Sequence, residues 1–159
     1  MRTRATWLAP VLLLALAAPA RADATAFLGA NTTPANRSMR GFAIGTGLLL
    51  LGFEFEYATT KNDNLAAAPS LKTGMANVLL QTPVAIFGFQ PYVTVGTGVY
   101  RERLGVHTDT SVAANTGGGV KVSLAGPIRL RVDYRVLKLG SGALYTPAHR
   151  IYAGLNRKF

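Results

Sequence analysis

Apolar and polar residues alternate one by one along much of this chain. The segment IRLRVDYRV at 128–136 has the clearest pattern: its even-numbered residues are all apolar and the odd-numbered residues between them are all charged. Successive side chains of a β-strand point to opposite faces, so this segment predicts a strand with one apolar and one charged face. Helical periodicity is not evident anywhere, and the pattern therefore predicts an all-β fold.

Segments of this kind follow one another at 24–31, 40–47, 50–60, 71–81, 89–102, 112–124, 128–138 and 148–159. Clusters of Gly, Pro, Asn and Ser separate them, as expected of turns between strands. The connectors after the first, third, fifth and seventh segments are longer and polar, whereas the other three are short. This alternation predicts an eight-stranded antiparallel up-and-down transmembrane β-barrel with four long extracellular loops.

The two faces of the predicted strands differ in chemistry. In the segment 50–60, Phe53 and Phe55 share one face, and Glu54 and Glu56 share the other. A soluble barrel would place the aromatic face inside, whereas a barrel in a bilayer would place it outside. The alternation alone leaves both arrangements open, and the two ends of the chain distinguish them.

The first 22 residues have the form of a cleaved secretory signal peptide. Arg2 and Arg4 precede an apolar stretch at 7–18, and Ala20 and Ala22 supply the small residues that signal peptidase requires. The stretch is shorter than the ~20 residues of a membrane-spanning helix, which disfavours the alternative of an N-terminal anchor. We therefore expect a signal peptide at 1–22 and a barrel domain at 23–159.

Composition narrows the classes of partner. Removing the three arginines of the predicted signal peptide lowers the formal charge from +10 to +7. The remaining cations are spread through the alternating segments of an exported chain, so we expect no nucleic-acid partner. The chain contains no cysteine, which excludes disulfides and thiolate metal ligands, and we expect neither a metal nor a cofactor.

The C-terminus carries a second indication of the outer membrane. The chain ends at Phe159, and Tyr152, Gly154 and Phe159 fit the insertion signal that the outer-membrane assembly machinery recognises. Arg157 departs from that pattern, because an apolar or aromatic residue is usual at its position. An arginine near the interface can still extend its charged group toward lipid phosphates.

Four motifs carry a resemblance to a known family: FGFQPYVTVGTGVYRE at 87–102, NTGGGVKV at 115–122, IRLRVDYRV at 128–136 and the ending YAGLNRKF. With them, residues 24–159 resemble the small eight-stranded outer-membrane barrels of the OmpA-like transmembrane and opacity-protein type. The resemblance implies location in the outer membrane, with lipids, lipopolysaccharide and the assembly machinery as partners. It implies little about activity, because members of one fold differ in role.

In a bilayer, the charged face of each strand must point into the lumen, since an arginine at the midplane of a barrel's lipid face costs ~2–4 kcal/mol. An eight-stranded barrel is narrow enough for side chains to fill, so these charges must pair. The predicted lumen network consists of Glu54, Glu56, Glu102, Lys121, Arg129, Arg131, Asp133 and Arg135. We expect Glu54 and Glu56 to pair with Arg129, Arg131 and Lys121, and Arg135 to pair with Glu102 or Asp133. The alternative is that some of these charges reach water at the rims.

One polar connector contains residue types that could support catalysis. His107, Asp109 and Ser111 of HTDTS correspond to a base, an orienting carboxylate and a nucleophile. Such residues are also common in polar surface loops, and the spacing alone does not establish a triad. We therefore expect no catalytic residues and no enzymatic activity.

These features together predict a non-enzymatic outer-membrane barrel with a side-chain-filled lumen. It would act in membrane integrity, adhesion or surface recognition through its extracellular loops. The alternatives are a small pore, a lipid-modifying enzyme that uses His107, Asp109 and Ser111, and a soluble periplasmic barrel that binds an apolar ligand.

Overall fold

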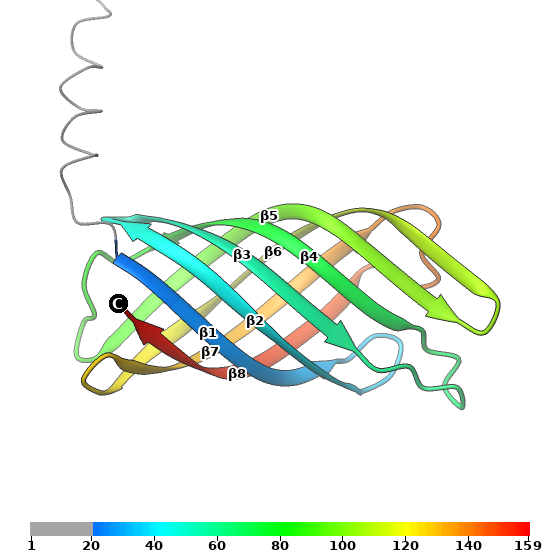
Figure 1. Cartoon of the computed structure of the whole chain (residues 1–159), viewed down its shortest axis with the longest axis horizontal. Helices are drawn as coiled ribbons and strands as arrows, with labels where there is room; N and C mark the ends of the chain where they lie inside the picture. The colour runs from blue at the N-terminus through cyan, green and yellow to red at the C-terminus, as the bar shows by residue number, and fades with distance from the viewer. Residues whose placement is uncertain (1–20) are drawn as a thin grey trace, which may run out of the picture.

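The computed structural model describes residues 21–159, and residues 1–20, which hold most of the predicted signal peptide, lie outside them. The strands are β1 (Arg21–Asn31), β2 (Arg37–Leu48), β3 (Leu51–Thr60), β4 (Ser70–Gln81), β5 (Phe89–Leu104), β6 (His107–Ala125), β7 (Ile128–Leu139) and β8 (Ala148–Lys158). Each strand pairs antiparallel with the next, and β8 pairs with β1 to close the barrel (Figure 1). The predicted all-β, eight-stranded, up-and-down barrel is confirmed.

Within residues 21–159, no helix is long and apolar enough to cross a membrane. Arg21 and Ala22, the last two residues of the predicted signal peptide, form the start of β1.

The connection between β5 and β6 differs from the prediction. We expected a long polar loop, but β5 and β6 continue as a hairpin and are joined by a turn of only Gly105 and Val106. Gly105 has a φ of 59°, a left-handed conformation that glycine adopts without strain. The hairpin extends beyond the other strands at the end opposite the C-terminus (Figure 1). The sequence of this hairpin is as polar as that of a loop, because this part of the two strands lies beyond the apolar belt, where both faces can meet water.

The other connections also depart in one place from the expected pattern. At the end predicted to be extracellular they span 32–36, 61–69 and 140–147. At the opposite end, where β1 begins and β8 ends and which we therefore take as periplasmic, they span 49–50, 82–88 and 126–127. The connection after β4 spans the residues that the sequence predicted, but the connection after β1 is shorter than predicted, so the expected alternation of long and short connections fails between these two.

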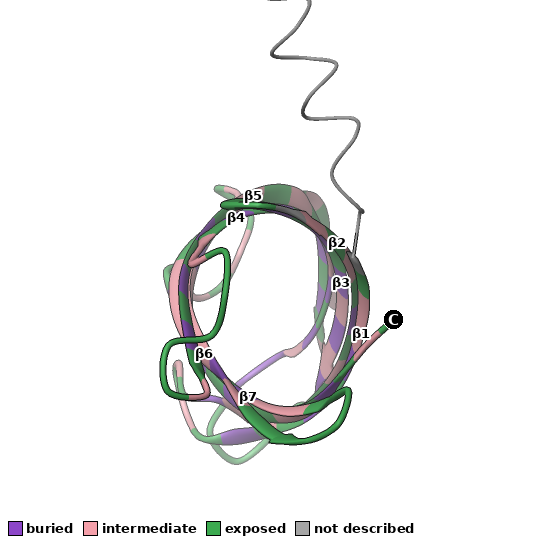
Figure 2. Ribbon diagram, turned by 90° about the vertical axis from the view of Figure 1, so that its left-hand side faces the viewer, coloured by how far each residue is buried: buried purple, intermediate pink, exposed green. Residues whose placement is uncertain are grey.

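The predicted parity of the strands is present throughout the barrel. In β3, Phe53 and Phe55 are 54% and 48% exposed, whereas Glu54 and Glu56 are 5% and 0% exposed. The strands close into a ring along which buried and exposed residues alternate (Figure 2). The exposed residues include many large apolar side chains. This arrangement contradicts a soluble barrel with an apolar core and a charged exterior. A bilayer is the solvent that suits a continuous apolar belt around a closed barrel.

Glycines on the lumen side of β6 leave room for large polar side chains. A Cβ added at Gly119 would lie 2.6 Å from the Tyr92 hydroxyl, and one added at Gly117 would lie 3.0 Å from Cγ of Arg135. The side chains of Arg135 and Tyr92 therefore occupy space that a larger residue at either glycine would fill.

We expect Gly119→Ala to lower the free energy of unfolding by about 1–3 kcal/mol, because the added methyl group would lie 2.2 Å from the backbone oxygen of Val132 and 2.6 Å from the Tyr92 hydroxyl. Urea titration of the refolded barrel in detergent micelles measures this change. Gly74→Ala is the matched control, because its added Cβ would meet only the side chains of Phe55 and Val99, at 3.9 and 4.0 Å. An equal effect at both positions would contradict the packing argument.

Candidate functional site

The middle of the lumen contains three arginines and three carboxylates. Arg131, Asp133 and Arg135 occupy alternate positions of β7, and Glu54 and Glu56 occupy alternate positions of β3 on the other side of the barrel. The sixth member is Arg150 of β8, and all six side chains are buried. We call these six residues the central ion network.

Contacts across the lumen join β7 to β3. Arg131 forms an ion pair with Glu54, and its Nη2 lies 3.0 Å from Oδ2 of Asp133. Arg135 donates from Nη2 to Oε1 of Glu54 at 3.0 Å and from Nε to Oδ1 of Asp133 at 2.9 Å. Its Nη1 lies 3.2 Å from Oε2 of Glu56. Arg135 therefore contacts all three carboxylates of the central ion network.

Two tyrosines add hydrogen bonds to the central ion network. The Tyr92 hydroxyl donates to Asp133 and accepts from Nε of Arg131 at 2.7 Å. The Tyr152 hydroxyl donates to Oε2 of Glu56 at 3.0 Å and accepts from Nη2 of Arg135 at 3.2 Å. These bonds matter energetically because an ion pair removed from water is stabilising only when its remaining polar atoms are also satisfied.

The role of Arg150 was not predicted. Its Nη1 lies 3.1 Å from Oε1 of Glu56, and its Nη2 donates to the Thr73 hydroxyl at 3.1 Å. Arg150 provides the third positive charge, so the six side chains carry three charges of each sign. The alternation of β8 places Arg150 on the same face as Tyr152, which is the signal in the sequence that would have identified it.

Lys121 and Arg129 do not pair with Glu54 and Glu56 as predicted. Both instead contact Oδ2 of Asp23, from Nζ at 2.8 Å and from Nη2 at 3.2 Å. The reason is that Arg131, Arg135 and Arg150 already surround Glu54 and Glu56. Asp23 was missed because it lies at the predicted cleavage point, where we expected the domain to begin rather than a lumen contact.

Arg129 and Lys121 belong to a polar layer at the periplasmic mouth. Arg129 also donates to the side-chain oxygens of Gln90 at 2.7 Å and Asn156 at 2.8 Å. A cavity of about 310 Å³ opens beside these residues and is lined in part by Asp23, Lys121 and Arg129. The central ion network lies farther along the lumen.

Glu102 does not pair with Arg135 either. Arg135 lies opposite Gly117, and Gly117 lies opposite Thr94, so Glu102 is eight residues farther along β5. Its Oε1 lies 3.1 Å from Nε2 of His107 and accepts from the backbone N–H of Leu144 at 2.7 Å. Glu102 therefore joins the β5–β6 hairpin to the last extracellular connection. The other predicted partner of Arg135, Asp133, does contact it.

His107, Asp109 and Ser111 lie on β6 rather than in a loop. The carboxylate that contacts His107 is Glu102, and Asp109 instead accepts a hydrogen bond from the Tyr100 hydroxyl. In the described part of the chain, no hydrogen bond joins Ser111 to His107 or to Asp109. The three residues therefore lack the connected arrangement of a catalytic triad. Residues 21–159 also contain no cluster of three or more potential metal ligands.

The residues of the predicted insertion signal lie on or next to β8. Tyr152 points into the lumen, Gly154 lies opposite Phe27 of β1, and Phe159 is 67% exposed just after the strand ends. The backbone N–H of Phe159 donates to the carbonyl of Ala22 at 2.8 Å, which holds the end of the chain against β1. Recognition of these residues by the assembly machinery stays a prediction.

No protein-family model matches the chain, and no curated protein is detectably similar to it. Solved structures are similar. The N-terminal β-barrel domain of Pseudomonas aeruginosa OprF has a TM-score of 0.68 and 14% identity, over 87% of this chain and 97% of that one. Neisserial surface protein A has a TM-score of 0.64 and 18% identity, over 88% and 96% of the two chains.

A third similar structure is the outer-membrane enzyme PagL, with a TM-score of 0.51 and 16% identity over 86% of this chain and 98% of that one. At these identities the likeness establishes the fold and no specific activity. The exposed apolar belt supplies the independent argument for a bilayer. The chain has the fold of the small eight-stranded outer-membrane β-barrels, and this fold together with its apolar belt places it in the outer membrane.

Proposed function

We propose that this protein is a non-enzymatic outer-membrane barrel that acts as a rigid platform for its extracellular connections, in membrane integrity, adhesion or surface recognition. The central ion network is the observation that carries the proposal. Its arginines and carboxylates join β7 and β8 to β3 across the lumen, so the barrel is braced from within. A barrel whose lumen is filled and whose strands are cross-linked by internal ion pairs is better suited to hold its extracellular connections in place than to conduct ions.

The extracellular end supports a role in recognition. Leu65 of the β3–β4 connection and Val106 of the β5–β6 turn are fully exposed. Because both lie in connections at the end predicted to be extracellular, their side chains are among the apolar groups that another surface would meet there. Replacing both with serine should reduce adhesion of cells that display the barrel and leave its amount in the outer membrane unchanged. Equal adhesion by both forms would count against recognition through these tips.

The lumen should not conduct. Since the central ion network occupies the middle of the barrel, we expect the purified, refolded protein to give no steady current in a planar lipid bilayer. The boiled protein provides the baseline, and a 16-stranded porin provides the positive control. A stable open level that disappears on boiling would favour the small-pore alternative.

A lipid-modifying enzyme is the second alternative, and its test uses His107. We expect the acyl chains of lipopolysaccharide to be the same in cells with the wild-type barrel, with His107→Ala and with no barrel, because within residues 21–159 no hydrogen bond joins the Ser111 hydroxyl to His107. Mass spectrometry of extracted lipid A measures the acyl pattern. Loss of an acyl chain that requires His107 would establish catalysis and overturn the proposal.

A further inference from the structure

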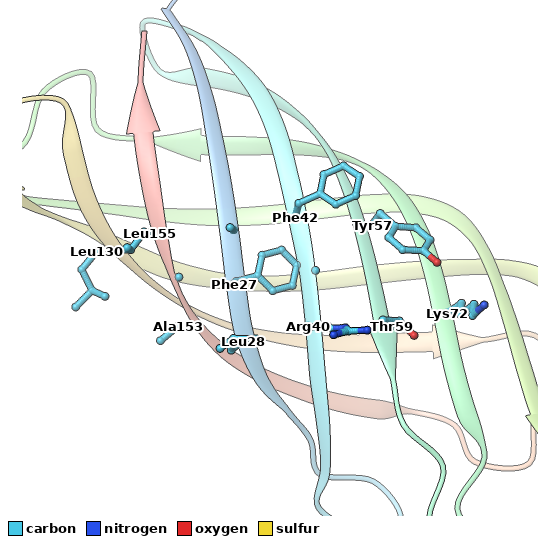
Figure 3. A pocket seen from close by; sticks show the side chains of 13 residues that line it. Phe27, Leu28, Arg40, Phe42, Tyr57, Thr59, Lys72, Leu130, Ala153 and Leu155 are labelled. Carbon is cyan, nitrogen blue, oxygen red and sulfur yellow. The ribbon is translucent and has the colours of Figure 1, made fainter.

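The outer wall of the barrel contains a groove of about 950 Å³ that crosses β8, β1 and β2 and is bordered by residues of β7, β3 and β4 (Figure 3). The small residues Ala26 and Ala153 form the floor of the groove. Its walls include the larger side chains of Leu28, Phe42 and Leu155. The groove exists because the outward residues of β1 other than Leu28 are alanines, whereas β2 and β3 present phenylalanines outward. An apolar channel of this kind in a bilayer is shaped to hold an acyl chain.

The extracellular end of the groove is basic. Arg40, Thr59 and Lys72 line it, and they lie opposite one another across β2, β3 and β4 (Figure 3). Arg101 of β5 lies opposite Lys72 and extends the row. All three cations point outward and are exposed. The row therefore borders the apolar belt on the extracellular side, at the height where lipid headgroups begin.

These cations are not used by the protein itself. Within residues 21–159, neither Arg40 nor Lys72 forms an ion pair or a side-chain hydrogen bond. An outward cation at the edge of the hydrocarbon is tolerated there and attracts an anionic headgroup. Strands two apart are separated by about 10 Å, so the long side chains of Arg40 and Lys72 can converge on one phosphate above Thr59.

We propose that this groove binds the lipid A portion of lipopolysaccharide, with an acyl chain over Ala26 and Ala153 and a phosphate between Arg40 and Lys72. The inference rests on the outer-membrane location in the proposed function, and it specifies the lipid. Lipid A carries two phosphates on a disaccharide, whereas an ordinary phospholipid carries one. The row of three cations matches the two phosphates of lipid A: Arg40 and Lys72 would bind one phosphate, and Arg101, which lies opposite Lys72, would bind the second.

Native mass spectrometry of the full-length barrel, refolded in detergent and titrated with diphosphoryl lipid A or with phosphatidylglycerol, tests the proposal. We expect lipid A to bind more tightly. Each basic residue at an anionic lipid surface strengthens attraction by about fivefold, so Arg40→Gln combined with Lys72→Gln should weaken lipid A binding by about 30-fold. Lys138→Gln is the matched control, since Lys138 is exposed on β7 and does not line the groove.

Two further measurements separate the phosphate contacts from the groove. Lipid A without phosphates should bind the wild-type barrel as weakly as the intact lipid binds the double variant. Ala153→Phe fills the groove, leaves the cations in place and should also abolish tight binding. Equal affinity for phosphatidylglycerol, unchanged binding by the double variant, or a second copy of the barrel in place of the lipid would each overturn the proposal. A folded barrel migrates more slowly on a gel after boiling than before it. If a protein that passes this test of folding shows no preference for lipid A, the lipid A inference fails while the proposed function is unaffected.

Discussion

Replacing Arg135 with alanine should lower the free energy of unfolding by about 3–5 kcal/mol, the usual effect of removing one partner from a buried ion pair. Arg135 contacts Glu54, Glu56 and Asp133, and its side chain is buried. The substitution leaves three buried carboxylates with fewer counter-charges and leaves an empty volume beside Gly117. Urea titration in detergent micelles, followed by circular dichroism and by gel migration, measures the loss.

Lys138→Ala is the control on the same strand. Lys138 has the same charge but is exposed on the outside of β7, so its removal should change stability by no more than about 0.5 kcal/mol. If Arg135→Ala were as harmless as Lys138→Ala, the central ion network would have no structural role. The proposal of an internally braced platform would then fail.

Placing a charge on the outer wall should also destabilise the barrel. Val93 lies on the lipid-facing side of β5 and is 58% exposed. We expect Val93→Arg to lower the free energy of unfolding in lipid bilayers by about 2–4 kcal/mol, because the guanidinium would enter hydrocarbon near the midplane. Folding of the variant into vesicles, titrated with urea against wild type, measures the change.

The same substitution at Val106 is the matched control. Val106 is fully exposed in the β5–β6 turn beyond the apolar belt, so Val106→Arg should leave stability unchanged. Equal tolerance of arginine at Val93 and Val106 would mean that water, not lipid, surrounds the barrel wall.

The outline of the barrel was predictable because alternation is a local property. In 128–136, every second residue is charged, and one register places all of those charges on one face. The same parity predicted that Glu54, Arg131 and Arg135 point inward, where they are found. The bilayer then determines which face is outside, because placing these four charges in hydrocarbon would cost about as much free energy as the whole stability of a typical protein.

The pairing of the inward charges was less predictable, because it depends on strand register and on the height of each residue in a tilted barrel. Asp133 and Arg131 were expected in the network and do contact Arg135 and Glu54. The prediction put Glu102 too close to Arg135. The position of a residue within its own strand does not determine its height relative to residues of another strand. Register between neighbouring strands provides that missing information.

The β5–β6 hairpin illustrates a different limit. The segment RLGVHTDTS at 103–111 contains the polar residues of a loop, yet most of it forms strands. Above the membrane both faces of a strand can meet water, so the alternation that identifies a strand in the belt weakens there. The turn at Gly105 is the one local signal, and it was insufficient to distinguish a hairpin from a loop.

The absence of cysteine allows a direct test of which face of the barrel meets lipid. Single cysteines at Val93, Thr94 and Val95 of β5 would carry spin labels in lipid vesicles, and collision with oxygen or with a water-soluble nickel complex reports the surroundings of each label. Val93 and Val95 are 58% and 61% exposed on the outer wall, whereas Thr94 is 2% exposed in the lumen. We predict high oxygen accessibility at 93 and 95 and low accessibility at 94. Higher oxygen accessibility at 94 than at both neighbours would contradict the account.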